Sequence, residues 1–188
     1  METNNTPAAE QIRKAKLLFA SGQIRESIRE FTVAEREGYE LVDIWLSRGA
    51  ALLALGHFIA AEKDFSNVLQ VQQENERAYY FRGISRAAQG RHQKAIDDLT
   101  QSLSRNNNRG IAHLIRGLSY AELGNKSDAV LDINSAGAFS DAEFDSFEKL
   151  FGTIGHPFRN ARALMAEENA PWNNLLDKAS AETLMKLL

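Results

Sequence analysis

The sequence repeats with a period of 34 residues, and this period restricts the chain to a small set of folds. Two series of glycines carry the period, at positions 22, 56, 90 and 124 and at positions 49, 83 and 117. Two packing series keep the same spacing: Ser27, Ala61, Ala95 and Ala129 form one, and Phe31, Phe65, Leu99 and Ile133 form the other. A unit of this length is one supersecondary motif, which buries its apolar face only by stacking on its neighbours. The period therefore predicts a repeat array.

The two glycine series have different expected roles. The series from Gly22 to Gly124 is predicted to end the first helix of each unit, because glycine adopts the left-handed conformation there without a steric penalty. The series from Gly49 to Gly117 is predicted to lie inside the first helices, where glycine costs about 1 kcal/mol relative to alanine. We expect a close approach of the second helix, at the small residues 61, 95 and 129, to offset this cost. The large members of the last series are expected to pack against the following helix.

The second unit shows the full pattern, with Trp45, Gly49, Leu52, Gly56, Phe58, Ala61 and Phe65. With its 34-residue period, this pattern resembles the tetratricopeptide repeat. The resemblance implies an all-α fold: a right-handed α-solenoid of helix-turn-helix repeats with C-terminal capping helices. We expect four repeats at about 8–41, 42–75, 76–109 and 110–143, a flexible N-terminus at 1–7, and capping helices with an amphipathic tail at 144–188.

Two series of charged residues follow the same period. Arg48, Arg82 and Arg116 precede the glycines of the first helices, and Asp64, Asp98 and Asp132 recur on the predicted second helices. Three arginines could together hold a phosphate or a carboxylate group. Because each arginine has an aspartate at the same spacing, we favour a structural ladder in which each Arg–Asp pair joins the two helices of one repeat.

The resemblance also implies that the first helices line a concave surface, which is the usual ligand surface of this family. The candidate binding residues there are Lys16, Asp43, Leu46, Ala50, Arg77, Tyr80, Phe81, Ile84, Ile111, Leu114, Ile115 and Leu118. Only Lys16 and Arg77 match in character the basic and amide set with which related domains hold acidic chaperone C-termini, and this argues against such a clamp. The stretch from Tyr80 to Leu118 is apolar, which predicts an amphipathic helix or an extended apolar peptide as the partner. Roughly half of these side chains are expected to be buried by the neighbouring repeat.

The repeat pattern stops after Ser140. The letters "SDAE" form a capping-box start, and Phe144, Phe147 and Phe151 give the predicted helix an apolar face that should cover the free edge of the fourth repeat. The last stretch, "NNLLDKASAETLMKLL", predicts an amphipathic tail. Three placements stay open for this tail: the convex side of the solenoid, its own groove, or the groove of a neighbouring copy, which would make a homo-oligomer.

Composition narrows the classes of function. The net charge is −3 and the basic residues are scattered, so nucleic acid is not an expected partner. The sequence has no cysteine, no signal-peptide pattern and no apolar window long enough to span a bilayer, which predicts a cytoplasmic protein. Its four histidines show no metal-ligand spacing, and it has no P-loop, dinucleotide fingerprint or serine elbow. We therefore expect no enzyme activity, no catalytic residue, no metal and no cofactor.

The leading hypothesis from the sequence is a non-catalytic adaptor, scaffold or assembly factor that binds an apolar protein segment in the groove, with Lys16, Asp43 and Arg77 tuning specificity at its rim. Under this hypothesis, Leu114→Asp should abolish partner binding without loss of helical structure. The alternative is a self-assembling structural protein whose C-terminal tail fills its own groove or a neighbour's. A chaperone that shields apolar segments is a third possibility.

Overall fold

The computed structural model describes residues 7–138 together with Phe147 and Lys149. This part of the chain is all-helical. Its eight helices are α1 Pro7–Ala20, α2 Ile24–Arg36, α3 Leu41–Ala54, α4 Phe58–Val71, α5 Glu76–Ala88, α6 His92–Arg105, α7 Gly110–Glu122 and α8 Lys126–Gly137. Residues 1–6 of the predicted flexible N-terminus lie outside the described residues, whereas Pro7 already begins α1. The capping helices and tail predicted for 144–188 also lie outside them, apart from Phe147 and Lys149.

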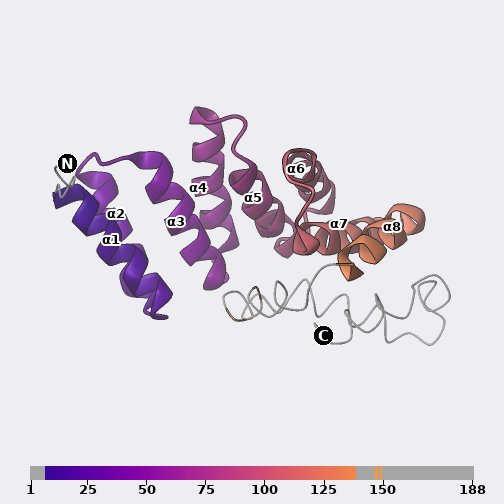
Figure 1. The fold of residues 1–188 in the computed structure, drawn as a ribbon, viewed down its shortest axis with the longest axis horizontal. Helices are drawn as coiled ribbons and strands as arrows, with labels where there is room; N and C mark the ends of the chain where they lie inside the picture. The colour runs from indigo at the N-terminus through magenta and orange to yellow at the C-terminus, as the bar shows by residue number, and fades with distance from the viewer. Residues whose placement is uncertain (1–6, 139–146, 148, 150–188) are drawn as a thin grey trace.

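The helices pack as successive pairs. Each helix contacts the next along the chain, and the pairs follow one another along the long axis of the molecule (Figure 1). The first helices of the pairs, α1, α3, α5 and α7, also contact one another in sequence, whereas α2, α4, α6 and α8 make fewer such contacts among themselves. The first helices therefore lie on the inner side of the curve. This arrangement is an α-solenoid, which confirms the predicted fold class.

A left-handed glycine ends the first helix of each pair, as the sequence predicts. At the end of α3, Gly56 has a φ of +76°, which brings its N–H within 2.9 Å of the Leu53 carbonyl oxygen. The N–H of His57 lies 2.9 Å from the carbonyl oxygen of Leu52. These two hydrogen bonds form a Schellman motif, which satisfies carbonyl groups that the helix end would otherwise leave unpaired. The turn that follows sends α4 back along α3.

The glycines inside α3, α5 and α7 mark close approaches between the helices of a pair. A Cβ atom added at Gly49 would lie 2.7 Å from Cε1 of Phe65, and one added at Gly83 would lie 2.7 Å from Cγ of Leu99. The predicted reason was therefore partly wrong. The close neighbours are mainly the large side chains of the second helix, and the small series contributes only a backbone oxygen, that of Ala129, near Gly117. Glycine is required because a large apolar side chain occupies the space of its missing Cβ.

The predicted Arg–Asp ladder is present in three pairs. In each pair, Nε and Nη2 of the arginine donate to the two carboxylate oxygens of a buried aspartate. The distances are 2.8 and 2.8 Å for Arg48–Asp64, 2.8 and 2.8 Å for Arg82–Asp98, and 2.6 and 2.7 Å for Arg116–Asp132. This two-point geometry fixes the orientation of both side chains, so the ladder joins the first and second helix of each pair.

The same arginines also reach the preceding pair. The third guanidinium nitrogen, Nη1, donates to the hydroxyl groups of Ser66 at 3.3 Å and Thr100 at 3.0 Å, and it lies 3.5 Å from that of Thr32. These three hydroxyl residues are themselves 34 residues apart, a series that the sequence analysis missed. Each ladder arginine therefore joins three helices, and it sets the spacing between successive pairs as well as within one.

The apolar core is continuous along most of the solenoid. One cluster of buried residues runs from Leu53 and Phe65 in α3 and α4 to Leu118 and Ile133 in α7 and α8, and it includes Phe147. The first pair has a separate cluster of Ala15, Phe31, Ala34 and Ile44. The second to fourth pairs thus share a single core, which is the frame for the inner face.

The close approach at Gly83 predicts a destabilising Gly83→Ala substitution. Alanine would gain about 1 kcal/mol of helix propensity, but its Cβ would overlap a fully buried Leu99, and such overpacking typically costs about 1–3 kcal/mol. We expect a net loss of about 1 kcal/mol in the free energy of unfolding, measured by urea denaturation. In the double variant with Leu99→Ala, the overlap disappears, so the loss should be smaller than the sum of the two single losses. Additive losses would show that the contact does not limit this position.

The ladder predicts that its buried acids matter and that exposed ion pairs do not. Asp98, whose side chain is 4% exposed, accepts hydrogen bonds from both Arg82 and Arg86. Removing the charge in Asp98→Asn should cost roughly 2–4 kcal/mol, because two arginines lose their counter-ion in a poorly solvated site. The matched control is Glu74→Gln, since the side chain of Glu74 is 82% exposed beside Arg105; its cost should stay within about 0.5 kcal/mol. Equal urea midpoints for the two variants would contradict the ladder's role.

Candidate functional site

The inner face is defined here as the surface formed by α1, α3, α5 and α7. All twelve predicted binding residues lie on these four helices. The structure buries seven of them, leaves three half-buried and two exposed: the buried residues are Ala50, Tyr80, Ile84, Ile111, Leu114, Ile115 and Leu118, the half-buried ones Asp43, Leu46 and Phe81, and the exposed ones Lys16 and Arg77. The fold thus brings the apolar members together. The stripe from Tyr80 to Leu118 is nevertheless not an open apolar surface, because most of its side chains are covered.

Burial changes the expected effect of Leu114→Asp. Leu114 is fully buried in the shared core. An aspartate there would place an unpaired charge in an apolar environment, which costs far more than one lost contact. The substitution would therefore unfold the fourth pair, so it cannot separate binding from folding. Leu46, which is half-buried on α3, is the better position for that purpose.

Aromatic side chains from neighbouring pairs stack behind the inner face. The rings of Phe65 in α4 and Phe81 in α5 are stacked with their centroids 5.5 Å apart. Tyr80 meets Phe81 edge-to-face at 4.9 Å, and the guanidinium carbon of Arg109 lies 4.4 Å from the centroid of the Tyr80 ring. Arg109 is in turn paired with Glu76, at 2.6 and 2.7 Å. This arrangement fixes the ring of Tyr80 between the linker before α7 and the helix that carries it.

The N-terminal end of the inner face is polar. Nζ of Lys16 in α1 lies 2.5 Å from Oδ2 of Asp43 in α3, so two of the predicted rim residues are paired with each other. They border a cavity of about 530 Å³, lined by Ala9, Ile12, Arg13, Lys16, Tyr39, Glu40 and Asp43. Because both charges are exposed, the pair contributes little to stability. Its charges are available to a ligand at this end of the face.

Comparison with known proteins supports the assignment of the repeats. The family model for the tetratricopeptide repeat matches residues 46–107, which span α4, α5, α6 and most of α3. This match falls on the ladder, the close-approach glycines and the left-handed glycines described above. This chain is a tetratricopeptide-repeat protein.

Solved structures share this fold along most of the chain. MamA from Desulfovibrio magneticus RS-1 is 19% identical, with a TM-score of 0.67 over 97% of this chain and 96% of that one. The tetratricopeptide-repeat protein TTC0263 from Thermus thermophilus is 19% identical, with a TM-score of 0.61 over 95% and 99%. A tetratricopeptide-repeat protein from Parabacteroides merdae is 17% identical, with a TM-score of 0.62 over 95% and 86%. No curated protein matches the sequence. At these identities, the likeness establishes the tetratricopeptide fold, that of a protein–protein interaction module whose concave surface is extended.

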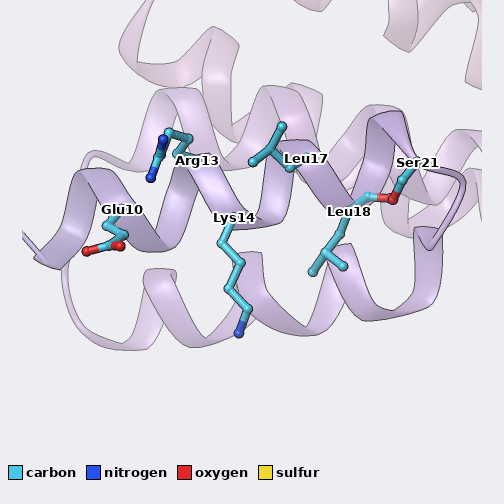
Figure 2. A pocket seen from close by; sticks show the side chains of 6 residues that line it. All are labelled: Glu10, Arg13, Lys14, Leu17, Leu18 and Ser21. Atoms are coloured by element: carbon cyan, nitrogen blue, oxygen red, sulfur yellow. The ribbon is translucent and has the colours of Figure 1, made fainter.

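The outer face of α1 carries a second, shallower depression. Figure 2 shows the six side chains that line its roughly 510 Å³, all of them on α1 or in the turn after it: Glu10, Arg13, Lys14, Leu17, Leu18 and Ser21. Leu17 is 61% exposed there, whereas Lys14 pairs with Glu30 of α2 at 2.8 Å. The charged members give the first tetratricopeptide unit the polar outer surface that the end of a solenoid needs. The sequence analysis did not single out this face, because one helix turn of apolar residues carries no repeat signal.

Within the described residues, no group of three or more histidine, aspartate or glutamate side chains could hold a metal ion. No described helix is long and apolar enough to cross a membrane. The buried acids of the tetratricopeptide frame face arginines instead of one another. The chemistry that the described side chains offer is therefore that of packing, ion pairing and hydrogen bonding.

The pair beside Tyr80 predicts an acid dependence of stability. Burial alone would raise the pKa of Glu76, but hydrogen bonds from Arg109 and Ser102 outweigh it and hold this pKa below its ordinary value of 4.5. A pKa lowered by folding gives stability that is present above the unfolded-state value and is lost as the pH falls through the folded-state value. Glu76→Gln removes this contribution, so its free energy of unfolding should fall less than that of the wild type between pH 7 and about pH 3.5. Parallel urea titrations at several pH values measure the difference, and identical slopes would contradict it.

Proposed function

We propose that this tetratricopeptide-repeat protein is a non-catalytic adaptor, scaffold or assembly factor. It binds an apolar, amphipathic segment of a partner protein along the inner face. The observation that carries the proposal is the change of chemistry along this face, from an exposed Lys16–Asp43 pair on α1 and α3 to a continuous apolar surface on α5 and α7. A partner segment with one charged end and one apolar face matches that change.

The energetics of such a complex would come from the apolar part. Burial of apolar area contributes about 25 cal/mol per Å², and a few well-packed anchors carry most of the affinity of an interface. Leu46 and Phe81, the half-buried apolar candidates, are the positions that a partner reaches first. Lys16, Asp43 and Arg77 would instead fix the direction and register of the segment, because exposed charges add more specificity than affinity.

The alternative function is self-assembly, in which the C-terminal tail of one copy fills the groove of another. Concentration-dependent size that disappears on truncation after Ala170 would favour it. The buried state of the inner face is compatible with this alternative, since a bound tail would also cover it. The proposal of an adaptor is preferred because the exposed polar end on α1 and α3 offers recognition groups that a purely apolar tail does not use.

The decisive test compares two substitutions of an apolar residue by aspartate. Leu46→Asp places a charge on the inner face, whereas Ile59→Asp places one on α4 at a side chain that is already 77% exposed. With each variant immobilised, we expect Leu46→Asp to retain less than about a tenth of a partner captured by the wild type from the source lysate, and Ile59→Asp to retain nearly all of it. Circular dichroism confirms folding. Undiminished capture by a folded Leu46→Asp would refute binding at the inner face.

A further inference from the structure

The inner face is covered unevenly along the solenoid, and the unevenness cannot come from the repeats themselves. Positions 34 residues apart occupy equivalent places on the first helices. On α1, Lys16 is exposed and Ile12 is half-buried, whereas their counterparts on α7, Leu118 and Leu114, are both buried. Among the described helices, α1 and α7 are the two ends of the row of first helices, so each has one first-helix neighbour. Something besides the four pairs therefore covers the face over α7.

Phe147 is the described residue that meets this requirement. It lies nine residues beyond the last residue described after α8, is only 6% exposed, and belongs to the same buried cluster as Tyr80, Ile84, Leu114 and Leu118. Of the residues that the structure describes after α8, it is the only buried one, since Ala138 and Lys149 are both exposed. A phenylalanine that joins the core from outside the four pairs contributes apolar cover to them.

We propose that the segment carrying Phe147 is the resident ligand of the inner face, seated over α5 and α7 of its own chain. Phe147 and Lys149 have helical backbone conformations, one buried and one exposed two positions later, as on an amphipathic helix. The sequence places Phe144 and Phe151 three residues before and four residues after Phe147, which is the spacing of one helix face. The sequence analysis expected this helix only at the free edge of the last repeat. The cluster extends its role to the binding surface.

This inference deepens the proposed function and rests on it for the place where a partner binds. An external partner must displace the resident segment, so its apparent affinity is reduced by the fraction of molecules in which the face is filled. The partner that competes best has the same chemistry, an amphipathic helix with aromatic residues at three- and four-residue spacing. The exposed polar end at Lys16 and Asp43 stays accessible while the apolar end is filled. A partner can therefore dock at the polar end first.

A labelled peptide tests the inference directly. The probe is a fluorescein-labelled synthetic peptide of residues 140–152, titrated by fluorescence anisotropy against the full-length chain. Phe147→Ala weakens the internal competitor, so this variant should bind the peptide at least tenfold more tightly than the wild type does. Lys149→Ala changes an exposed residue of the same segment and should bind like the wild type. Adding Leu46→Asp to the Phe147→Ala chain should abolish the gain.

Three results would overturn the inference. Equal affinity of the wild type and Phe147→Ala would show that Phe147 does not occupy the face. Absence of binding to a Phe147→Ala chain that melts cooperatively would show that the segment has no affinity for it. A wild-type dimer that becomes monomeric on Phe147→Ala would show that the segment fills the face of another copy. None of these results decides whether Leu46→Asp loses its lysate partner, so the proposed function stands or falls by its own experiment.

Discussion

The structure depends on how closely the two helices of each pair approach. At Gly49 and Gly83, a side chain of the second helix occupies the volume that a Cβ would need, so the two backbones meet at the closest distance that packing allows. This contact makes each hairpin a rigid plate with large side chains on both surfaces. Rigid plates of equal shape stack with a constant rotation, which is why a single local contact, repeated, produces a curved solenoid with an inner face.

The charged ladder gives this stack its register. An apolar contact tolerates sliding, because burial has no direction, whereas a bidentate Arg–Asp pair holds only one relative position of two helices. Arg82 binds Asp98 within its own pair and reaches Ser66 of the pair before it. Burying these charges is costly, and the aspartates stay ionised there only because the guanidinium groups face them. Burial alone would raise the pKa of Asp132, for example, but Arg116 and His113 hold it below its ordinary value.

Function follows from what this frame leaves over. Residues that serve the close approach or the ladder cannot change without loss of the fold, and the remaining positions of the first helices form the inner face. On α1 and α3 they are polar and accessible, and on α5 and α7 they are apolar and covered. A surface with this division suits a ligand that is held at one end by charge and at the other by burial. It also suits regulation, because apolar cover that the chain supplies itself has to be removed before a partner can replace it.

The 34-residue period was enough to predict the helix pairs, the left-handed turn at Gly56 and the partners in the ladder, because each depends on neighbours at short, repeated separations. The hydroxyl series of Thr32, Ser66 and Thr100 was equally periodic and could have been found the same way. Burial of the inner face could not. Leu114 and Leu46 occupy equivalent places in the repeat, yet one is buried and the other half-buried. That difference depends on contacts between segments far apart in the sequence, such as the packing of Phe147 into the shared core, and only the tertiary structure decides them.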